Sequence, residues 1–362
     1  MTNLLIFLLN LFSITSGFVF PCYYYYEPNG LTPELIPSDL CTHIIILGCV
    51  DETNLLVESL QKPFNCSSAF EKMTKLREKN PKLSLSVSIA TNQDAMNRVV
   101  SSEKLMTEYV DSAVELVKRF NFQGIDFDYE FPCGIYKQLF TKMIEMTREK
   151  VGNSLLITAA IGAPINLLED CYEIEKISRY LDLIHIMCYN YNTIYNNYTA
   201  YSQPLFARPE ETGFDATLNT NFTINYLLAK NIPREKIVLG LSADGHTFQL
   251  KNKADNGFHS DVLGIGYGAG WTILSEICKT IKGGGKKIYD ETAEALYVVY
   301  DDQWANCGDV RSAIAKSKWV KKMNLAGIFT WALNIDDLSN SCGYNICFPL
   351  HTSINKILFE DY

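Results

Sequence analysis

The segment "GIDFDYEF", residues 124–131, places a carboxylate at every second position. Asp126, Asp128 and Glu130 alternate with apolar side chains, and a period of two is that of a β-strand. Side chains on one face of a strand lie about 6.5–7 Å apart, so three ionised carboxylates there would repel one another. At least one of them is therefore expected to keep its proton to a higher pH than a free carboxyl group. The alternative is an edge strand with a solvated acidic face.

Seven further runs of strand-like composition surround this segment, at residues 18–26, 43–48, 83–89, 155–161, 182–189, 236–241 and 327–331. Helical periodicity lies between them, at residues 69–80, 103–120, 134–150, 223–230 and 309–323. Strands that alternate with helices indicate parallel strands joined by right-handed crossovers. Eight such units predict an α/β fold of the (β/α)8 TIM barrel type. A doubly wound open sheet is the alternative, but no Gly-rich phosphate loop follows the first run.

One part of the chain is too long for an ordinary barrel unit. Residues 246–302 contain the short helical segment "TILSEICKTI" and the strand-like segment "ALYVVYD". We therefore predict a small α+β insertion between the seventh strand and the last helix. The first part of the barrel would comprise residues 18–245, and residues 303–362 would complete it.

The first 17 residues and three glycosylation motifs indicate a secreted protein. Residues 1–17 form an apolar run with Thr15 and Gly17 at positions suited to a signal-peptidase site. Three N-glycosylation sequons, at Asn65, Asn197 and Asn221, fit this expectation. A net charge of −9 argues against nucleic acid as a partner, and no later segment is long and apolar enough to span a membrane.

Polar and aromatic side chains stand at the ends of several predicted strands. Glu130 would end the fourth strand and Trp331 the eighth, while Tyr189 and Asn190 would end the sixth. Catalytic groups of a TIM barrel lie at the carboxyl ends of its strands, so these residues are expected to meet. Each also has a structural interpretation, because aromatic residues close barrel ends and Asn is common in turns.

Several segments of the chain match known sequence motifs. "FQGIDFDYEFP" resembles the D-x-x-D-x-D-x-E signature of the chitinases and chitinase-like proteins of glycoside hydrolase family 18. "IMCYN" resembles the sixth-strand M-x-Y-D of that family, and "AGIFTWALNIDDLSNSCG" resembles its last strand with its Trp. "PCYYYY", "LCTHIIIL" and "IPREKIVLGLSADGHTF" are similar to its first, second and seventh strands. The resemblance covers nearly the whole chain beyond residue 17.

This resemblance implies a retaining, substrate-assisted hydrolysis of β-1,4 links next to N-acetylglucosamine, in which the acetamido oxygen of the substrate replaces a second carboxylate. Glu130 would be the general acid, and Asp128 would orient the acetamido N–H. Asp126 would share a proton with Asp128, and Tyr189 would donate a hydrogen bond to the acetamido carbonyl.

The same resemblance implies a set of substrate contacts and no cofactor. Trp331 would form the floor beneath the sugar at the cleavage position. The other expected substrate-binding residues are Asn190, Met187, Tyr23, Phe131 and His246. A metal-dependent enzyme with the three acids as ligands is a weaker hypothesis, because none of the five histidines has ligand spacing to them.

The chain also departs from the family pattern. The departures are Gln123 at the first Asp of the signature, Ser88 and Ile89 where two glycines usually stand, Asn190 for the Asp of M-x-Y-D, Asp244-Gly245-His246 for Y-G-R, and Gly48 for a Phe. Several sugar-gripping aromatic residues and an Arg are thereby lost, so short soluble oligomers are expected to be better substrates than crystalline chitin. His246 is a candidate replacement contact, with an expected pH dependence near neutrality.

Eleven cysteines indicate an oxidising compartment, and their odd number leaves at least one unpaired. The family pattern implies disulfides between Cys22 and Cys41 and between Cys278 and Cys342. Further pairs are guessed at positions 49–66 and 133–171, and Cys188 is expected to be a free thiol.

Two functions remain open at this point. The first is a secreted, monomeric hydrolase that acts on chitin or on oligosaccharides containing N-acetylglucosamine. The second is a lectin-like or signalling protein on the same barrel, with weak catalysis or none. The presence of Glu130 favours the enzyme, but a fold does not decide between them because function belongs to the site.

Overall fold

The computed structural model describes residues 17–27, 30–47, 66–90 and 93–360. The predicted signal peptide therefore lies outside the described residues except for Gly17, and so do Gly48 and Cys49. Eight parallel strands close a barrel in the order β1-β14-β7-β6-β5-β4-β3-β2, which confirms the predicted (β/α)8 fold. The strands are β1 Pro21–Tyr25, β2 His43–Leu47, β3 Ser84–Ala90, β4 Gly124–Asp128, β5 Leu156–Gly162, β6 Leu183–Met187, β7 Ile237–Ser242 and β14 Gly327–Trp331.

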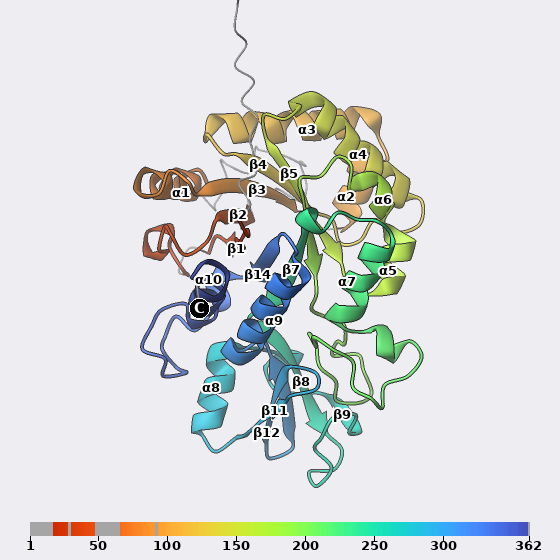
Figure 1. Ribbon diagram of the computed structural model, residues 1–362, viewed down its shortest axis with the longest axis vertical. Helices are drawn as coiled ribbons and strands as arrows, with labels where there is room; N and C mark the ends of the chain where they lie inside the picture. Colours follow the sequence, from red (N-terminus) through yellow and green to blue (C-terminus); the bar gives the residue numbers. More distant parts are fainter. Residues whose placement is uncertain (1–16, 28–29, 48–65, 91–92, 361–362) are drawn as a thin grey trace, which may run out of the picture.

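Helices surround this barrel in the order of the chain (Figure 1). They are α1 Cys66–Lys79, α2 Gln93–Val100, α3 Glu103–Arg119, α4 Tyr136–Val151, α5 Ile165–Cys171, α6 Ile174–Ile177, α7 Thr220–Ala229, α9 Val310–Met323 and α10 Pro349–Phe359. Single 3-10 turns occur at Pro33–Leu35, Asp215–Thr217, Arg234–Lys236, Gly268–Gly270 and Leu333–Ile335. Helices α2, α5 and α6 were not predicted, because eight, seven and four residues are too few for a clear helical period. The sequence analysis also missed α10.

Helix α3 shows how the hydrophobic pattern produces the outer layer. Ser102 caps its first turn by accepting a hydrogen bond from the backbone N–H of Leu105. The predicted apolar face is buried, with Met106, Val110 and Val117 at most 2% exposed. Burial of one such side chain stabilises the fold by roughly 1.5–3 kcal/mol, so the three together contribute more than the cap, which contributes about 0.5–2 kcal/mol.

The insertion is a separate antiparallel sheet beside the barrel. It comprises β8 Asp244–Leu250, β9 Val262–Ile265, β10 Trp271–Ile273, α8 Leu274–Lys282, β11 Lys286–Asp290, β12 Ala295–Tyr300 and β13 Gln303–Cys307. Its strand order is β10-β8-β13-β12-β11, and β9 pairs with β8. A Cβ atom at Gly245 would lie 1.9 Å from the carbonyl oxygen of Asn306, so glycine permits the close approach of β8 to β13.

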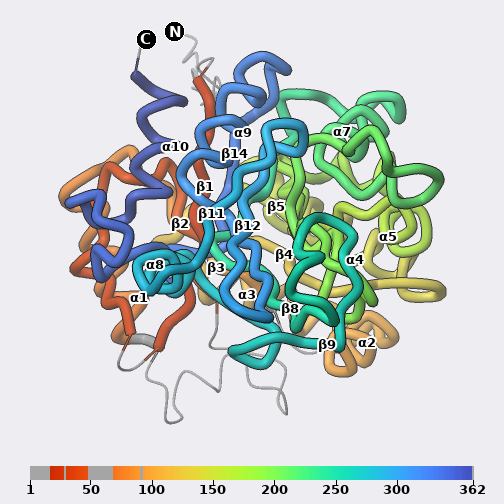
Figure 2. The backbone as a smooth tube through the Cα atoms, turned by 90° about the horizontal axis from the view of Figure 1, so that it is seen from below, coloured from red at the N-terminus to blue at the C-terminus, as the bar shows by residue number. Residues whose placement is uncertain are grey.

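The position of the insertion follows from its first strand. Strand β8 begins two residues after β7 ends, so the chain passes from the carboxyl end of β7 directly into the insertion. Figure 1 shows β8, β9, β11, β12 and α8 together at one end of the molecule, and Figure 2 shows them from below, in front of the barrel. The insertion therefore borders the mouth, by which we mean the face formed by the carboxyl ends of the barrel strands.

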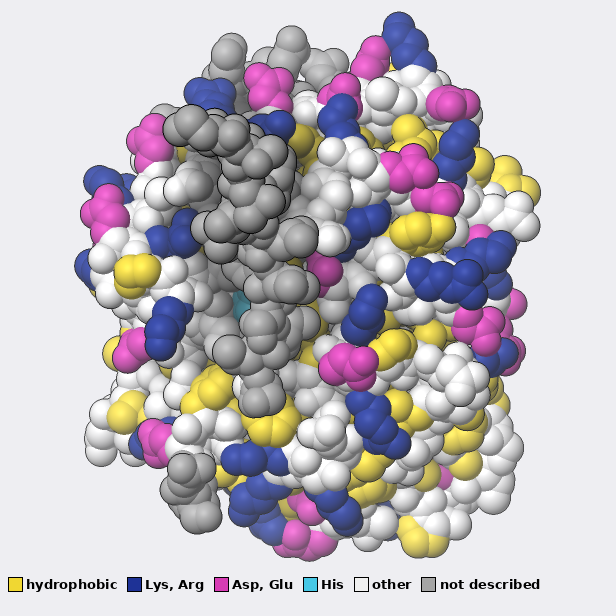
Figure 3. Space-filling view, turned by 45° about the horizontal axis from the view of Figure 1, so that its top comes forward, with side chains coloured by type: hydrophobic (Ala, Val, Ile, Leu, Met, Phe, Trp, Pro, Cys, Tyr) yellow, Lys and Arg dark blue, Asp and Glu magenta, His cyan; other side chains and the backbone are white. Residues whose placement is uncertain are grey.

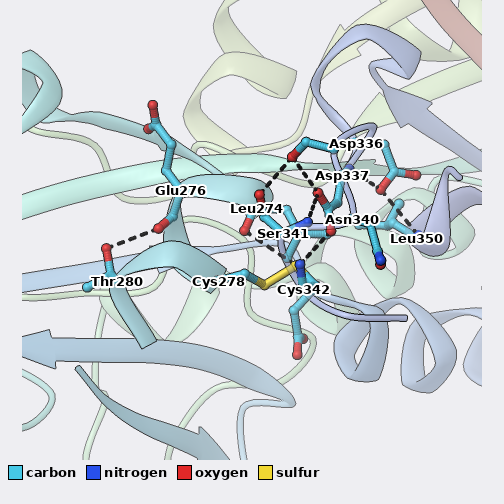
Figure 4. The surroundings of a disulfide bond; sticks show 12 residues. Leu274, Glu276, Cys278, Thr280, Asp336, Asp337, Asn340, Ser341, Cys342 and Leu350 are labelled. Atoms are coloured by element: carbon cyan, nitrogen blue, oxygen red, sulfur yellow. Dashed lines mark hydrogen bonds between the residues drawn. A yellow bond between two sulfur atoms is a disulfide. The ribbon is translucent and has the colours of Figure 1, made fainter. Parts of the chain in front are cut away.

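Disulfides connect these parts as the family resemblance implied. Cys22 pairs with Cys41, and Cys278 on α8 pairs with Cys342 after the last barrel strand. The Asp337 carboxylate accepts hydrogen bonds from the backbone N–H groups of Ser341 and Cys342, which holds that segment in place (Figure 4). The structure also contains a disulfide between Cys133 and Cys171.

The remaining cysteines differ in their surroundings. Cys188 is a buried free thiol, as predicted. Cys307 is also free and buried, and Cys347 is free and exposed. The guessed pair at positions 49–66 lies outside the residues whose side chains are described.

The surface charges and the hydropathy of the helices bear on the possible partners. On the face shown in Figure 3, Lys and Arg side chains are intermixed with Asp and Glu side chains. Within the described ranges, none of the helices has both the length and the hydropathy needed to cross a bilayer.

Candidate active site

Asp126 is the centre of a fully buried hydrogen-bond network inside the barrel. Strand register places Ser88 of β3 and Thr158 of β5 on either side of it. The Ser88 hydroxyl donates to Oδ2 over 2.8 Å, and the Thr158 hydroxyl donates to Oδ1. The Tyr23 hydroxyl of β1 donates to Oδ2 over 3.0 Å. Three hydroxyl donors are thus directed at the two oxygen atoms of one carboxyl group.

Tyr23 links this carboxylate to a buried histidine. Its hydroxyl oxygen lies 3.0 Å from Nδ1 of His185 on β6, and that nitrogen lies 3.5 Å from Oδ1 of Asp126. Burial raises the pKa of Tyr23 well above its ordinary value, and the charge of Asp126 raises this pKa further. Tyr23 therefore stays a neutral hydroxyl in the barrel interior.

Asp128 is less deeply buried than Asp126 and has fewer partners. Its Oδ1 atom is buried without a hydrogen-bond partner among the described residues. Burial, followed by the charges of Glu130 and Asp126, raises the pKa of Asp128 well above its ordinary value. Within the described residues, the hydrogen bonds to the Asp126 carboxyl group come from hydroxyl groups, so a proton shared between Asp126 and Asp128 stays a prediction.

Glu130 lies two residues beyond the end of β4, and its side chain is exposed at the mouth. The surrounding protein still removes much of the solvent around its carboxyl group, and this desolvation raises the pKa of Glu130. Solvent exposure therefore increases along the three acids, from buried Asp126 through half-buried Asp128 to exposed Glu130. A proton held on Glu130 is accessible to a molecule at the mouth.

Tyr189 is a neutral donor at the end of β6, which is two strands from β4 around the barrel. It lies two residues beyond the end of β6 and is 9% exposed. Burial raises the pKa of Tyr189 well above its ordinary value, with further contributions from the charges of Glu130, Asp128 and Asp244. Its hydroxyl therefore keeps its proton and lies within electrostatic reach of both of the outer acids.

Aromatic side chains form the base of the mouth around Trp331. The ring of Tyr25 stacks on Trp331 at a centroid distance of 5.8 Å, and Tyr23 lies at 6.0 Å. On the other side of the barrel, Phe131 lies against Gly162 at the end of β5, where a Cβ atom would be 3.0 Å from its ring. Met187, the last residue of β6, is the register partner of Gly162.

The insertion side of the mouth carries a second polar group. Asn190 has a φ of 56°, a left-handed conformation that Asn tolerates well, and its Oδ1 lies 3.0 Å from Nε2 of His246 on β8. Burial lowers the pKa of His246 below its ordinary value. The expected pH dependence near neutrality is therefore moved to lower pH, because the imidazole is neutral at pH 7.

The structure brings the predicted catalytic and substrate-binding residues to one end of the barrel, with Asp126 and Tyr23 below its surface. Sequence reasoning missed Thr158, His185 and Tyr25, and it treated Ser88 only as a departure from a glycine motif. The sequence offered no local signal for them, because only the strand register of the folded barrel brings a small hydroxyl residue on each neighbouring strand opposite Asp126.

A metal ion bound at this end of the barrel would need several His, Cys, Asp or Glu side chains as ligands. Within the described residues, no group of three or more His, Cys, Asp or Glu side chains is arranged to hold a metal ion. Asp126 is instead surrounded by hydroxyl donors, which do not suit a carboxylate that binds a cation.

Comparisons with known proteins agree with this geometry. The endochitinase of Brugia malayi is 28% identical over 392 residues, covering 99% of this chain and 77% of that protein. Probable chitinase 10 of Drosophila melanogaster is 27% identical over 369 residues, but the chain spans only 16% of its length. The structure of human YKL-39, described as a pseudo-chitinase with retained chitooligosaccharide binding, superposes with a TM-score of 0.87 at 25% identity, covering 94% of this chain and 100% of that one.

The model of the glycosyl hydrolases family 18 matches residues 20–336. This range contains the whole barrel with its insertion, and therefore all the side chains that meet at the mouth. The chain thus belongs to the glycosyl hydrolases family 18.

Proposed function

We propose that this protein is a secreted, retaining glycoside hydrolase that cleaves β-1,4 links next to N-acetylglucosamine in short oligosaccharides. The observation that carries the proposal is the pair formed by Asp128 and Glu130. The pKa of each carboxyl group is raised, and each has lost solvent to the surrounding protein. A general acid that works near neutral pH needs a carboxyl group of this kind.

Each residue has a definite role in the proposed reaction. Glu130 gives its proton to the glycosidic oxygen while the bond from that oxygen to C1 of the sugar breaks. The acetamido oxygen of the same sugar forms the new bond to C1, so no protein nucleophile is needed. Asp128 accepts a hydrogen bond from the acetamido N–H as positive charge develops there. The Glu130 carboxylate then takes a proton from the water that attacks C1, and the original configuration at C1 is restored.

Other side chains prepare this reaction. Tyr189 stays protonated and is placed to donate to the acetamido oxygen, which orients it towards C1. The exposed part of Trp331, stacked on Tyr25, offers an apolar floor for a sugar face. Asp126 would hold negative charge beneath Asp128 while its three hydroxyl donors stabilise that charge. The three disulfides in the described part of the chain support an oxidising compartment, and hence secretion.

A second function on the same site is binding with little or no turnover. It is favoured by the YKL-39 comparison, because a relative of similar fold is described as a pseudo-chitinase that binds chitooligosaccharides. It is also favoured by the altered residues Asn190, Asp244 and His246 at the mouth. The presence of Glu130 with a raised pKa supports the hydrolase over this alternative.

Product analysis tests the proposal. The purified protein is incubated with N-acetylglucosamine oligomers from trimer to hexamer, and the products are identified by mass spectrometry. The anomeric configuration of fresh products is read by NMR. Shorter oligomers with the β configuration are expected. Binding of the oligomers without any shortening would reject the hydrolase and favour the binding protein, whereas initial α products would reject the retaining mechanism.

A further inference from the structure

An exposed tryptophan from the insertion joins the altered residues at the mouth. Trp271 is the most exposed of the four tryptophans, at 43%, although large aromatic side chains are usually covered. It begins β10, and β10 pairs with β8 in an antiparallel register that places Trp271 opposite His246. Side chains of directly opposed residues project from the same face of a sheet. Trp271 and His246 therefore face the same way.

The His246 side chain shows which way that is. Its Nε2 atom lies 3.0 Å from Oδ1 of Asn190, immediately after β6 at the mouth. Asp244 precedes His246 by two residues on β8 and so shares its face. The Ser242 hydroxyl lies within hydrogen-bond distance of both the Asp244 carboxylate and the backbone oxygen of Trp331, which places Asp244 beside the end of β14. The face that carries Trp271 is therefore directed towards the barrel mouth.

The indole of Trp271 is held in place although it is exposed. Its Nε1–H donates a hydrogen bond of 2.9 Å to Oδ2 of Asp244. The other oxygen of Asp244 accepts a hydrogen bond from the Ser242 hydroxyl at the end of β7. An exposed aromatic ring fixed through its polar edge leaves its faces free, and an apolar ring face with a fixed orientation suits stacking against a sugar ring.

Neutral polar groups complete this surface. His246 is uncharged at neutral pH because burial lowers its pKa. Its Nε2–H donates to Oδ1 of Asn190, and its Nδ1 atom is buried. The Asn190 side chain is exposed, so its amide can both donate from Nδ2 and accept at Oδ1. Sugar hydroxyls also donate and accept, so this combination matches an uncharged saccharide better than it matches an anion or a peptide.

We propose that Trp271, fixed by Asp244 and flanked by His246 and Asn190, forms a sugar-binding subsite next to the one above Trp331. The inference rests on the proposed function for the class of ligand. In this arrangement Trp271 of the insertion and Trp331 of the barrel contact different sugars of one oligosaccharide. The subsite determines affinity for longer oligomers and takes no part in the proton transfers.

Equilibrium binding tests the inference without requiring hydrolysis. Titration calorimetry with the N-acetylglucosamine hexamer and dimer is carried out on Glu130→Gln protein, so that the ligand stays intact. Adding Trp271→Ala is expected to weaken hexamer binding about 10-fold, or about 1.4 kcal/mol, and to change dimer binding less. Trp271→Phe, which keeps a ring but loses the N–H, is expected to lie between the two. Tyr300→Ala is the matched control, because Tyr300 is 50% exposed on the same insertion but lies on β12, three strands from β10.

Three results would overturn the inference. One is equal hexamer affinity with and without Trp271. Another is the same loss from Tyr300→Ala. The third is an equal loss for dimer and hexamer, which would place Trp271 at the cleavage subsite. Failure of the proposed function looks different, because wild-type protein would then bind the hexamer without shortening it. Absence of any oligomer binding would overturn both.

Discussion

The β4 side and the insertion side of the mouth follow opposite patterns. On the β4 side, Asp126, Asp128 and Glu130 match the family signature, and their charges are managed by burial and by hydroxyl donors from neighbouring strands. On the insertion side, Asp244 and His246 depart from the family pattern, yet they form specific contacts with Trp271 and Asn190. In the proposed function, the chemistry of bond cleavage and the recognition of the sugar chain would be carried by these two separable parts.

The largest effect is expected from Glu130→Gln on the β4 side, which tests whether this side carries the proton transfer. The amide has nearly the same shape but cannot deliver a proton, so kcat is expected to fall on the order of 10²–10⁴-fold. Hexamer affinity measured by calorimetry is expected to stay close to that of the wild type. The control is Glu175→Gln, an exposed glutamate at α6, which should leave both quantities unchanged. Wild-type turnover by Glu130→Gln would show that another group is the acid.

The disulfide between Cys278 and Cys342 tests the insertion side. It closes a separation of 64 residues and ties α8 to the segment after β14. Replacing both cysteines with Ser is expected to reduce the free energy of unfolding by about 2–5 kcal/mol, measured by chemical denaturation. The KM for the hexamer should rise more than kcat falls, because Trp271 and α8 are adjacent in the chain.

The matched control for this change is Cys347→Ser, since Cys347 is a free, exposed cysteine. Its stability and its KM are expected to equal those of the wild type. A fall in kcat with an unchanged KM in the double variant would contradict the separation of the two sides.

Tyr23→Phe tests how much the hydrogen bonds to Asp126 contribute on the β4 side. It removes one of the three hydroxyl donors to buried Asp126, and a hydrogen bond to a charged group contributes roughly 1.5–3 kcal/mol to stability. Tyr24→Phe is the neighbouring control, because the Tyr24 hydroxyl donates to the neutral carbonyl oxygen of Leu31 and should cost only about 0.5–1.5 kcal/mol. We also expect kcat to fall in Tyr23→Phe alone. Equal unfolding free energies for the two variants would show that the bond from Tyr23 to Asp126 contributes no more than a bond to a neutral carbonyl oxygen.

Asp128→Asn is expected to change how stability depends on pH. The pKa of Asp128 is raised in the folded protein, so its stabilising contribution is complete below the pKa of the unfolded chain and is lost as pH rises through the folded value. The variant lacks this loss. Its stability relative to the wild type should therefore increase between pH 4 and pH 7, by at most about 1.4 kcal/mol per pH unit. The free energies of unfolding of the variant and the wild type are measured by chemical denaturation at each pH. A difference between them that stays constant from pH 4 to pH 7 would refute the raised pKa.

The sequence alone determined most of the architecture, because the relevant signals are local. Runs of strand-like composition identified the eight barrel strands, a period of 3.6 residues identified the long helices, and "GIDFDYEF" identified the acids. The ends of the elements were less exact. Glu130, Tyr189 and Asn190 lie just beyond their strands, and the insertion sheet extends from Asp244 to Cys307 rather than over residues 246–302.

Only the tertiary structure decided which side chains meet. The donors to Asp126 come from Tyr23, Ser88 and Thr158, which lie on three other strands, and their meeting depends on barrel closure and strand register. Trp271 reaches the mouth only because β10 pairs with β8 in one register, and a shift of one residue would turn it to the opposite face. Register arises from packing between distant segments, so no local pattern of residues encodes it.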